Sequence, residues 1–161
     1  MKQKIIAGLI IAVFSSSALA SIKDKKAIRA ADTSIADETA KVIASCGNTK
    51  LDVNVNWEDY KKMLAANEAK LADNKYKSEW VITHSGQRTV SVLEAIANIC
   101  KDDADYKEEL ALLTKIEVSA KQDFKDSQSE FTLNDTVLKI ATGHKMTRSA
   151  SDFAKKIKAL Y

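Results

Sequence analysis

The chain has 161 residues, of which 45% are hydrophobic and 29% charged, with 25 Lys and Arg against 22 Asp and Glu. Without the first 20 residues, which carry Lys2 and Lys4, it keeps 23 basic and 22 acidic side chains, a formal charge of +1. Nucleic-acid binding normally requires a strong basic excess on one face, so we expect no nucleic-acid partner.

The first 20 residues have the pattern of a secretory signal peptide. Lys2 and Lys4 precede an apolar run over residues 5–14, and small residues follow, with Ala18 and Ala20 at the positions that a signal peptidase reads. The apolar run is much shorter than the roughly 20 residues that cross a bilayer, so we expect no transmembrane segment. The sequence therefore predicts a signal peptide over residues 1–20, a single α+β domain over residues 21–161, and a periplasmic or secreted location.

Cys46 and Cys100 are the only two cysteines, an even number in a chain predicted to enter an oxidising compartment. Each follows an apolar stripe with helical spacing, so both side chains are expected to face the core. We therefore predict a Cys46–Cys100 disulfide. In the loop-entropy model, closing a loop of this length destabilises the unfolded chain by about 4 kcal/mol.

The first half of the chain predicts two helices and one strand. Residues 23–45, rich in Ala, Lys, Asp and Glu, favour a helix that Gly47 ends. Residues 51–57 alternate apolar and polar side chains, as in a strand with one buried face. Residues 58–72 return to an amphipathic helical pattern. Residues 73–88 are polar and irregular, which predicts a loop.

Within this predicted loop, Trp80, Val81 and Ile82 could form a short edge strand. A capping box between Ser91 and Glu94 predicts the start of the next helix. That helix is expected to end near Cys100, and residues 103–113 predict a further helix.

Alternation of apolar and polar residues then predicts three strands, around residues 116–118, 131–133 and 138–140. Asn134-Asp135 is suitable for the turn between the last two strands. A second capping box, formed by Ser149 and Asp152, predicts a C-terminal amphipathic helix that docks on the sheet. This order of elements favours an α+β fold with an antiparallel sheet of about four strands packed against several helices and one disulfide.

The sequence carries no recognisable catalytic, metal or cofactor motif. His84 and His144 are the only histidines, and their spacing is not that of a zinc site. The Gly-x-Ser-x-Gly pattern of a hydrolase nucleophile is absent. We therefore name no catalytic residue, metal ligand or cofactor.

Four residues of the predicted loop suggest a binding surface: Tyr76, Trp80, His84 and Arg88. Aromatic side chains and arginine dominate the residues that contribute most to protein–protein affinity. We interpret the chain as an exported, soluble, non-catalytic binding module, an inhibitor or neutraliser of an envelope or secreted protein. Two alternatives stay open: a small periplasmic hydrolase whose site forms only in the fold, and a carrier of a small apolar ligand.

Overall fold

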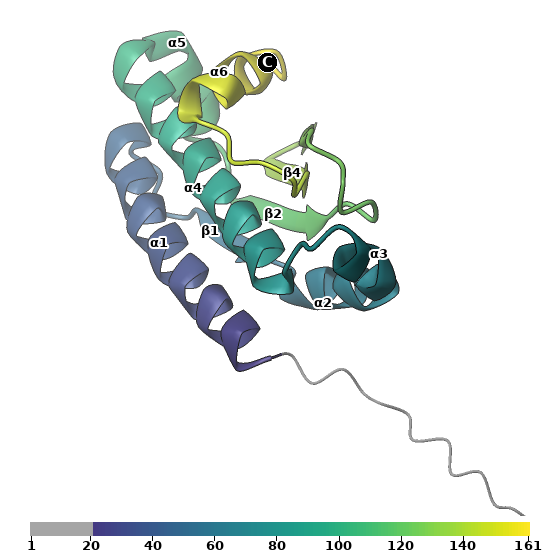
Figure 1. Cartoon of the computed structure of the whole chain (residues 1–161). Helices are drawn as coiled ribbons and strands as arrows, with labels where there is room; N and C mark the ends of the chain where they lie inside the picture. Colours follow the sequence, from purple (N-terminus) through teal and green to yellow (C-terminus); the bar gives the residue numbers. More distant parts are fainter. Residues whose placement is uncertain (1–20) are drawn as a thin grey trace, which may run out of the picture.

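The computed structural model describes residues 21–161, and the predicted signal peptide lies outside these described residues. In the described part, helices cover one face of a four-stranded sheet (Figure 1). Helices α2 and α3 lie at one end of the molecule and α5 at the other. The elements, in chain order, are α1 (Ile22–Cys46), β1 (Asp52–Val55), α2 (Trp57–Ala66), α3 (Glu68–Asp73), α4 (Ser78–Asp102), α5 (Ala104–Leu110), β2 (Lys115–Ala120), β3 (Glu130–Asn134), β4 (Val137–Thr142) and α6 (Ala150–Lys158).

Helices α1 and α4, 25 residues each, run side by side in the same direction and are fixed to one another at both ends. At their starts the Ser78 hydroxyl donates a 2.7 Å hydrogen bond to Asp24. At their ends the Cys46–Cys100 disulfide joins Cα atoms 5.1 Å apart. The predicted disulfide and the predicted first helix are confirmed, and Gly47 ends that helix with a left-handed φ of 74°.

The predicted loop over residues 73–88 is wrong for most of its length. Helix α4 begins at Ser78, so Trp80, Val81 and Ile82 are helical and form no edge strand. Gly86 lies inside α4 at a point where α1 packs so closely that a side chain would not fit. A Cβ atom at Gly86 would lie 2.6 Å from the Cβ atom of Ala31 on α1. The glycine allows close helix packing inside a segment that the sequence pattern predicted to be a loop.

The predicted helix over residues 58–72 is divided into α2 and α3 at Asn67. The buried Asn67 side chain donates hydrogen bonds to the backbone oxygens of Met63, at 2.8 Å, and Gln122, at 3.1 Å. An asparagine that bonds nearby backbone in this way competes with continued helix formation. The break therefore ties the end of α2 to the segment that follows β2.

The sheet is mixed, so the prediction of an antiparallel sheet is wrong in this respect. The strand order is β1-β2-β4-β3, and β1–β2 and β2–β4 are parallel pairs. Only β3 and β4 pair antiparallel, joined by a tight turn in which Asp135 has a φ of 51°. Strands β1 and β2 run parallel because the chain between them crosses over through helices α2 to α5.

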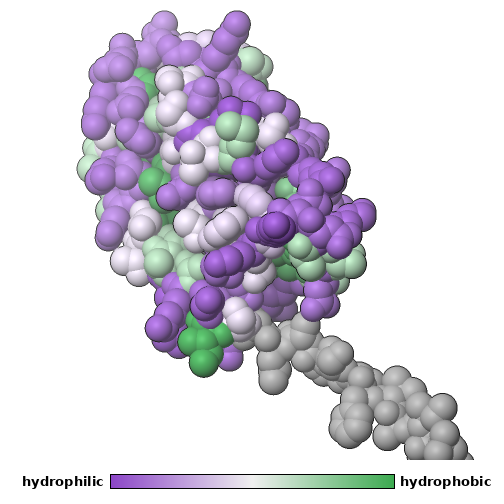
Figure 2. All heavy atoms as spheres, viewed as in Figure 1, coloured by the Kyte–Doolittle hydropathy of each residue, from purple (hydrophilic) through white to green (hydrophobic). Residues whose placement is uncertain are grey.

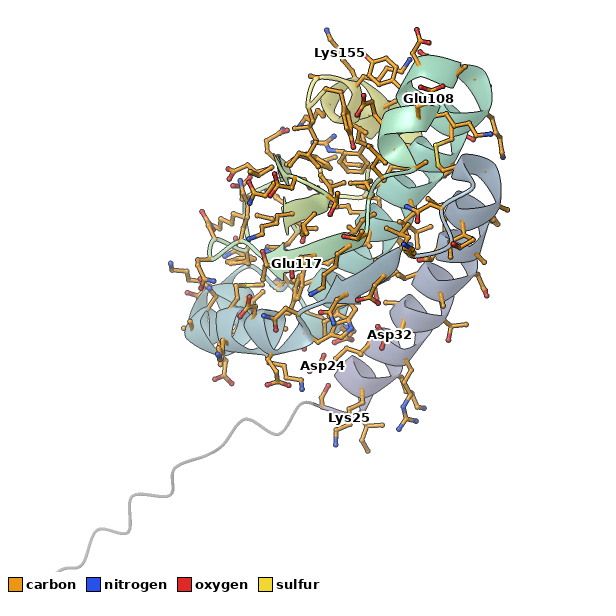
Figure 3. All side chains as sticks on the ribbon, turned by 180° about the vertical axis from the view of Figure 1, so that it is seen from behind. Asp24, Lys25, Asp32, Glu108, Glu117 and Lys155 are labelled. Atoms are coloured by element: carbon orange, nitrogen blue, oxygen red, sulfur yellow. A yellow bond between two sulfur atoms is a disulfide. The ribbon has the colours of Figure 1, made fainter. Side chains whose placement is uncertain are left out.

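The two faces of the sheet differ in polarity. Ile116, Val118, Leu138 and Ile140 are buried on the face covered by the helices and belong to the main hydrophobic core. The opposite face carries polar side chains, and Figure 3 shows Glu117 on this uncovered side. The predicted α+β class with helices packed on a sheet is thus correct. Among residues 21–161, no helix has the length and apolar character needed to cross a membrane.

Candidate functional site

The first turns of α4 bring together three of the four residues that the sequence suggested for binding. Tyr76 precedes the helix, while Trp80 and His84 are four residues apart and so lie on one helical face. The Tyr76 and Trp80 rings meet edge to face, with centroids 5.6 Å apart. The Tyr76 hydroxyl is 2.8 Å from His84 Nδ1, so hydrogen bonding holds the two side chains together.

The segment after β4 completes this surface. The Tyr76 hydroxyl approaches the backbone oxygens of His144, at 3.3 Å, and Lys145, at 3.4 Å. Met146, the next residue, is 52% exposed, and Trp80 is 41% exposed. We call Tyr76, Trp80, His84 and Met146 the aromatic patch. Sequence reasoning missed Met146, because nothing local to it indicates that its segment folds back against α4.

Arg88 is the fourth predicted binding residue, and the structure places it in the interior instead of on the surface. Its Nε donates to the backbone oxygen of Met146, and its Nη1 donates to Ser127 O at 2.9 Å and to Ser129 Oγ at 3.2 Å. Within residues 21–161 its Nη2 has no partner. Burial lowers the pKa of Arg88, and the charge of Arg148 lowers it further. Arg88 is therefore fully buried and holds together the loops that carry Ser127, Ser129 and Met146.

A buried polar cluster behind the aromatic patch bears on the hydrolase alternative. Ser85 and His144 are fully buried, with Ser85 Oγ 3.2 Å from His144 Nδ1. His144 Nε2 lies 2.8 Å from the carbonyl oxygen of Lys121, which can only accept, so Nε2 carries the proton. The unprotonated Nδ1 then accepts from the Ser85 hydroxyl.

This arrangement places a serine beside an imidazole, as serine hydrolases do, but two features differ. The partner of the second ring nitrogen is a carbonyl, where a catalytic triad has a carboxylate. Neither side chain is accessible to a substrate. Burial lowers the pKa of His144 and raises that of the nearby Tyr60 to about 12, so both side chains are held neutral. The pair forms part of the packed interior.

Two open grooves bear on the alternative of an apolar-ligand carrier. One, of about 550 Å³, follows the line between α1 and α4, and small side chains such as Ala27, Ala30 and Gly86 line it. Figure 2 shows paler atoms along the helices within a mostly hydrophilic surface. A second groove, of about 330 Å³, lies between α2, α3 and the starts of α1 and α4. It shares Tyr76 with the aromatic patch, but Asp24, Lys61 and Glu68 also line it, so its wall is partly charged.

The described residues contain no group of three or more His, Cys, Asp or Glu side chains placed to hold a metal ion. Comparisons of the chain with protein-family models, with curated proteins and with solved structures found no match.

Proposed function

We propose that the mature chain is an exported, non-catalytic binding module that docks on an envelope or secreted protein through the aromatic patch. The observation that supports this is the grouping of exposed Trp80 with half-buried Tyr76 and His84 at the start of α4, where the Tyr76 hydroxyl also contacts the segment that carries exposed Met146. Side chains that combine apolar area with fixed orientation lose little conformational entropy on binding. Such a patch suits an inhibitor or neutraliser, whose effect requires only that it cover its target.

The charges around the patch indicate the chemistry of the partner. Lys75, Lys77 and Lys145 are exposed, and none of them forms an ion pair within the described part of the chain. The Lys77 ammonium lies 5.2 Å from the centre of the Trp80 ring. A target with an apolar centre and a carboxylate-rich rim would complement this surface.

Replacement of Trp80 by Ala tests the proposal. We expect the mature protein to retain a specific protein from envelope extract or culture medium, and Trp80→Ala to weaken binding of that purified protein by about 30-fold, the effect of a typical hot-spot residue. Leu112→Ala is the matched control, because Leu112 is 62% exposed and lies after α5, at the other end of the molecule. Titration by calorimetry measures both variants.

Salt provides a second readout for the same complex. Because the proposed rim contacts are exposed ion pairs, affinity should fall as salt increases, and Lys77→Gln with Lys145→Gln should remove most of this dependence. Equal binding by the wild-type protein and Trp80→Ala would contradict the assignment of the patch. Equal loss in Trp80→Ala and Leu112→Ala would also contradict it, since the effect would then not be local.

A further inference from the structure

Strand β1 forms one edge of the sheet, and its outer backbone groups are unpaired. The amides of Asp52 and Asn56 donate to β2 and its flank, at Thr114 O, 3.0 Å, and Val118 O, 2.8 Å. Backbone groups alternate sides along a strand, so those of Val53 and Val55 point away from β2. Among residues 21–161 no other strand lies on that side. Two donors and two acceptors are therefore available to an added strand.

A groove of about 430 Å³ lies beside this edge, between β1 and α1. We call it the β1 groove. Strands in a sheet are about 4.8 Å apart, so an added strand would lie under the outer side of α1. Ala36 and Ala40 of α1 are exposed there, and their small size leaves room for inward-facing side chains. Ile35, Ile43, Leu51, Val53 and Val55 give the β1 groove its apolar wall.

The charges of the β1 groove have one sign. Asp52 lies at the start of β1. Asp32 of α1 lies near the end of β1, where its carboxylate accepts a 2.7 Å hydrogen bond from the Trp57 indole. Figure 3 shows Asp32 on α1 at this side of the sheet. No Lys, Arg or His lines the β1 groove. An apolar segment with a cationic residue near each end would match this distribution.

We propose that the free edge of β1 binds an extended segment of a partner protein by strand addition. The segment pairs with the backbone of Val53 and Val55, directs alternate apolar side chains into the β1 groove, and carries Lys or Arg near its ends. A second copy of the chain fits less well, because edge-to-edge pairing would gather Asp32 and Asp52 of both copies at one junction. The β1 groove shares no residue with the aromatic patch, so this inference is independent of the proposed function.

The probe is the peptide Lys-Val-Thr-Val-Thr-Val-Lys, with a matched peptide in which Glu replaces both Lys residues. Hydrogen exchange of the Val53 and Val55 amides, followed by NMR on the mature protein, reports pairing directly. We expect the lysine peptide to slow both amides about tenfold or more, and the glutamate peptide to bind about tenfold more weakly. No binding, or binding without protection of these two amides, overturns the proposal.

Ala36→Trp fills the β1 groove and should weaken the lysine peptide about tenfold or more. Ala30→Trp is the control, because it makes the same change on the same helix but in the groove shared with α4. Equal loss in both variants would overturn the proposal. Sedimentation of the peptide-free protein adds a further check: a dimer whose Val53 and Val55 amides are already protected would assign the edge to a second copy instead.

Discussion

Arg88 lies in the interior of α4 and determines the position of the loops around it. A buried guanidinium is unfavourable unless its donors find acceptors, and here the acceptors are the backbone oxygens of Met146 and Ser127 and the Ser129 hydroxyl. Met146 belongs to the aromatic patch, so the position of part of the patch depends on a buried residue. The sequence suggested Arg88 for the same surface as Tyr76, but it could not distinguish an exposed side chain from a buried one.

His144 should make stability depend on pH. Burial lowers its pKa below the ordinary 6.5. Below about pH 6.5 the unfolded chain therefore binds a proton that the folded chain does not. The free energy of unfolding then decreases as the pH is lowered, until the pH reaches the lowered pKa of His144 in the folded chain. Above about pH 6.5 both states hold the neutral imidazole, so this contribution is constant. Urea unfolding from about pH 8 to about pH 5 measures the slope.

His144→Gln should remove this part of the pH dependence, because glutamine does not titrate. The variant should also be less stable near neutral pH, since Ser85 and Lys121 lose their fitted partner. An unchanged slope in His144→Gln would show that another group is responsible. The slope reports the difference in bound protons between the folded and unfolded states, whereas the absolute stability also contains the lost hydrogen bonds.

At the scale of elements, the contact between α1 and α4 depends on Gly86. In an exposed helix interior, Gly→Ala stabilises by about 1 kcal/mol. Here the new Cβ atom would lie 2.6 Å from that of Ala31 and would force the two helices apart. We expect Gly86→Ala to destabilise the protein by about 1–2 kcal/mol despite its better helix propensity. Chemical denaturation measures the difference.

The double variant Gly86→Ala with Ala31→Gly is the control for this contact, because it moves the methyl group from one helix to the other. The two changes should couple favourably by about 1 kcal/mol in a double-mutant cycle. Additive effects would mean that close packing at this point does not limit stability. Gln87→Ala, an exposed neighbour on α4, should change stability by less than about 0.5 kcal/mol.

For the whole molecule, the Cys46–Cys100 disulfide joins the far ends of its two longest helices. The cysteines are 54 residues apart, and the closed segment contains β1, α2, α3 and most of α4. Replacing both cysteines by Ala should lower the free energy of unfolding by about 4 kcal/mol, because the unfolded chain regains the entropy of that open loop. Urea unfolding of the oxidised protein, the reduced protein and the double variant checks this. A reduced protein as stable as the oxidised one would contradict the prediction.

The two proposed surfaces lie on different parts of the molecule, and each has its own readout. The aromatic patch is tested with Trp80→Ala, and the β1 groove with Ala36→Trp. Trp80 lies on α4, whereas Ala36 lies on the side of α1 that faces β1. Loss of one binding activity should therefore leave the other intact, as expected for distant and independent sites.

The sequence by itself determined the features that depend on neighbours along the chain. Helical spacing before Cys46 and Cys100 predicted two core-facing cysteines, and period-two alternation predicted all four strands. The capping box at Ser149 and Asp152 correctly predicted the start of α6, whereas the helix start predicted from Ser91 and Glu94 was wrong, because both residues lie inside α4. Such patterns show which face of an element is buried, because burial repeats with the local period.

Only the tertiary structure decided the features that depend on which elements become neighbours. Alternation in a strand is the same for parallel and antiparallel partners, so the mixed sheet followed from the helical crossover between β1 and β2. Gly86 was explained only by the approach of Ala31, and Met146 joined the patch only because the segment after β4 folds back onto Arg88. The free edge of β1 likewise exists only in the sheet, because no local pattern specifies which strand has a single neighbour.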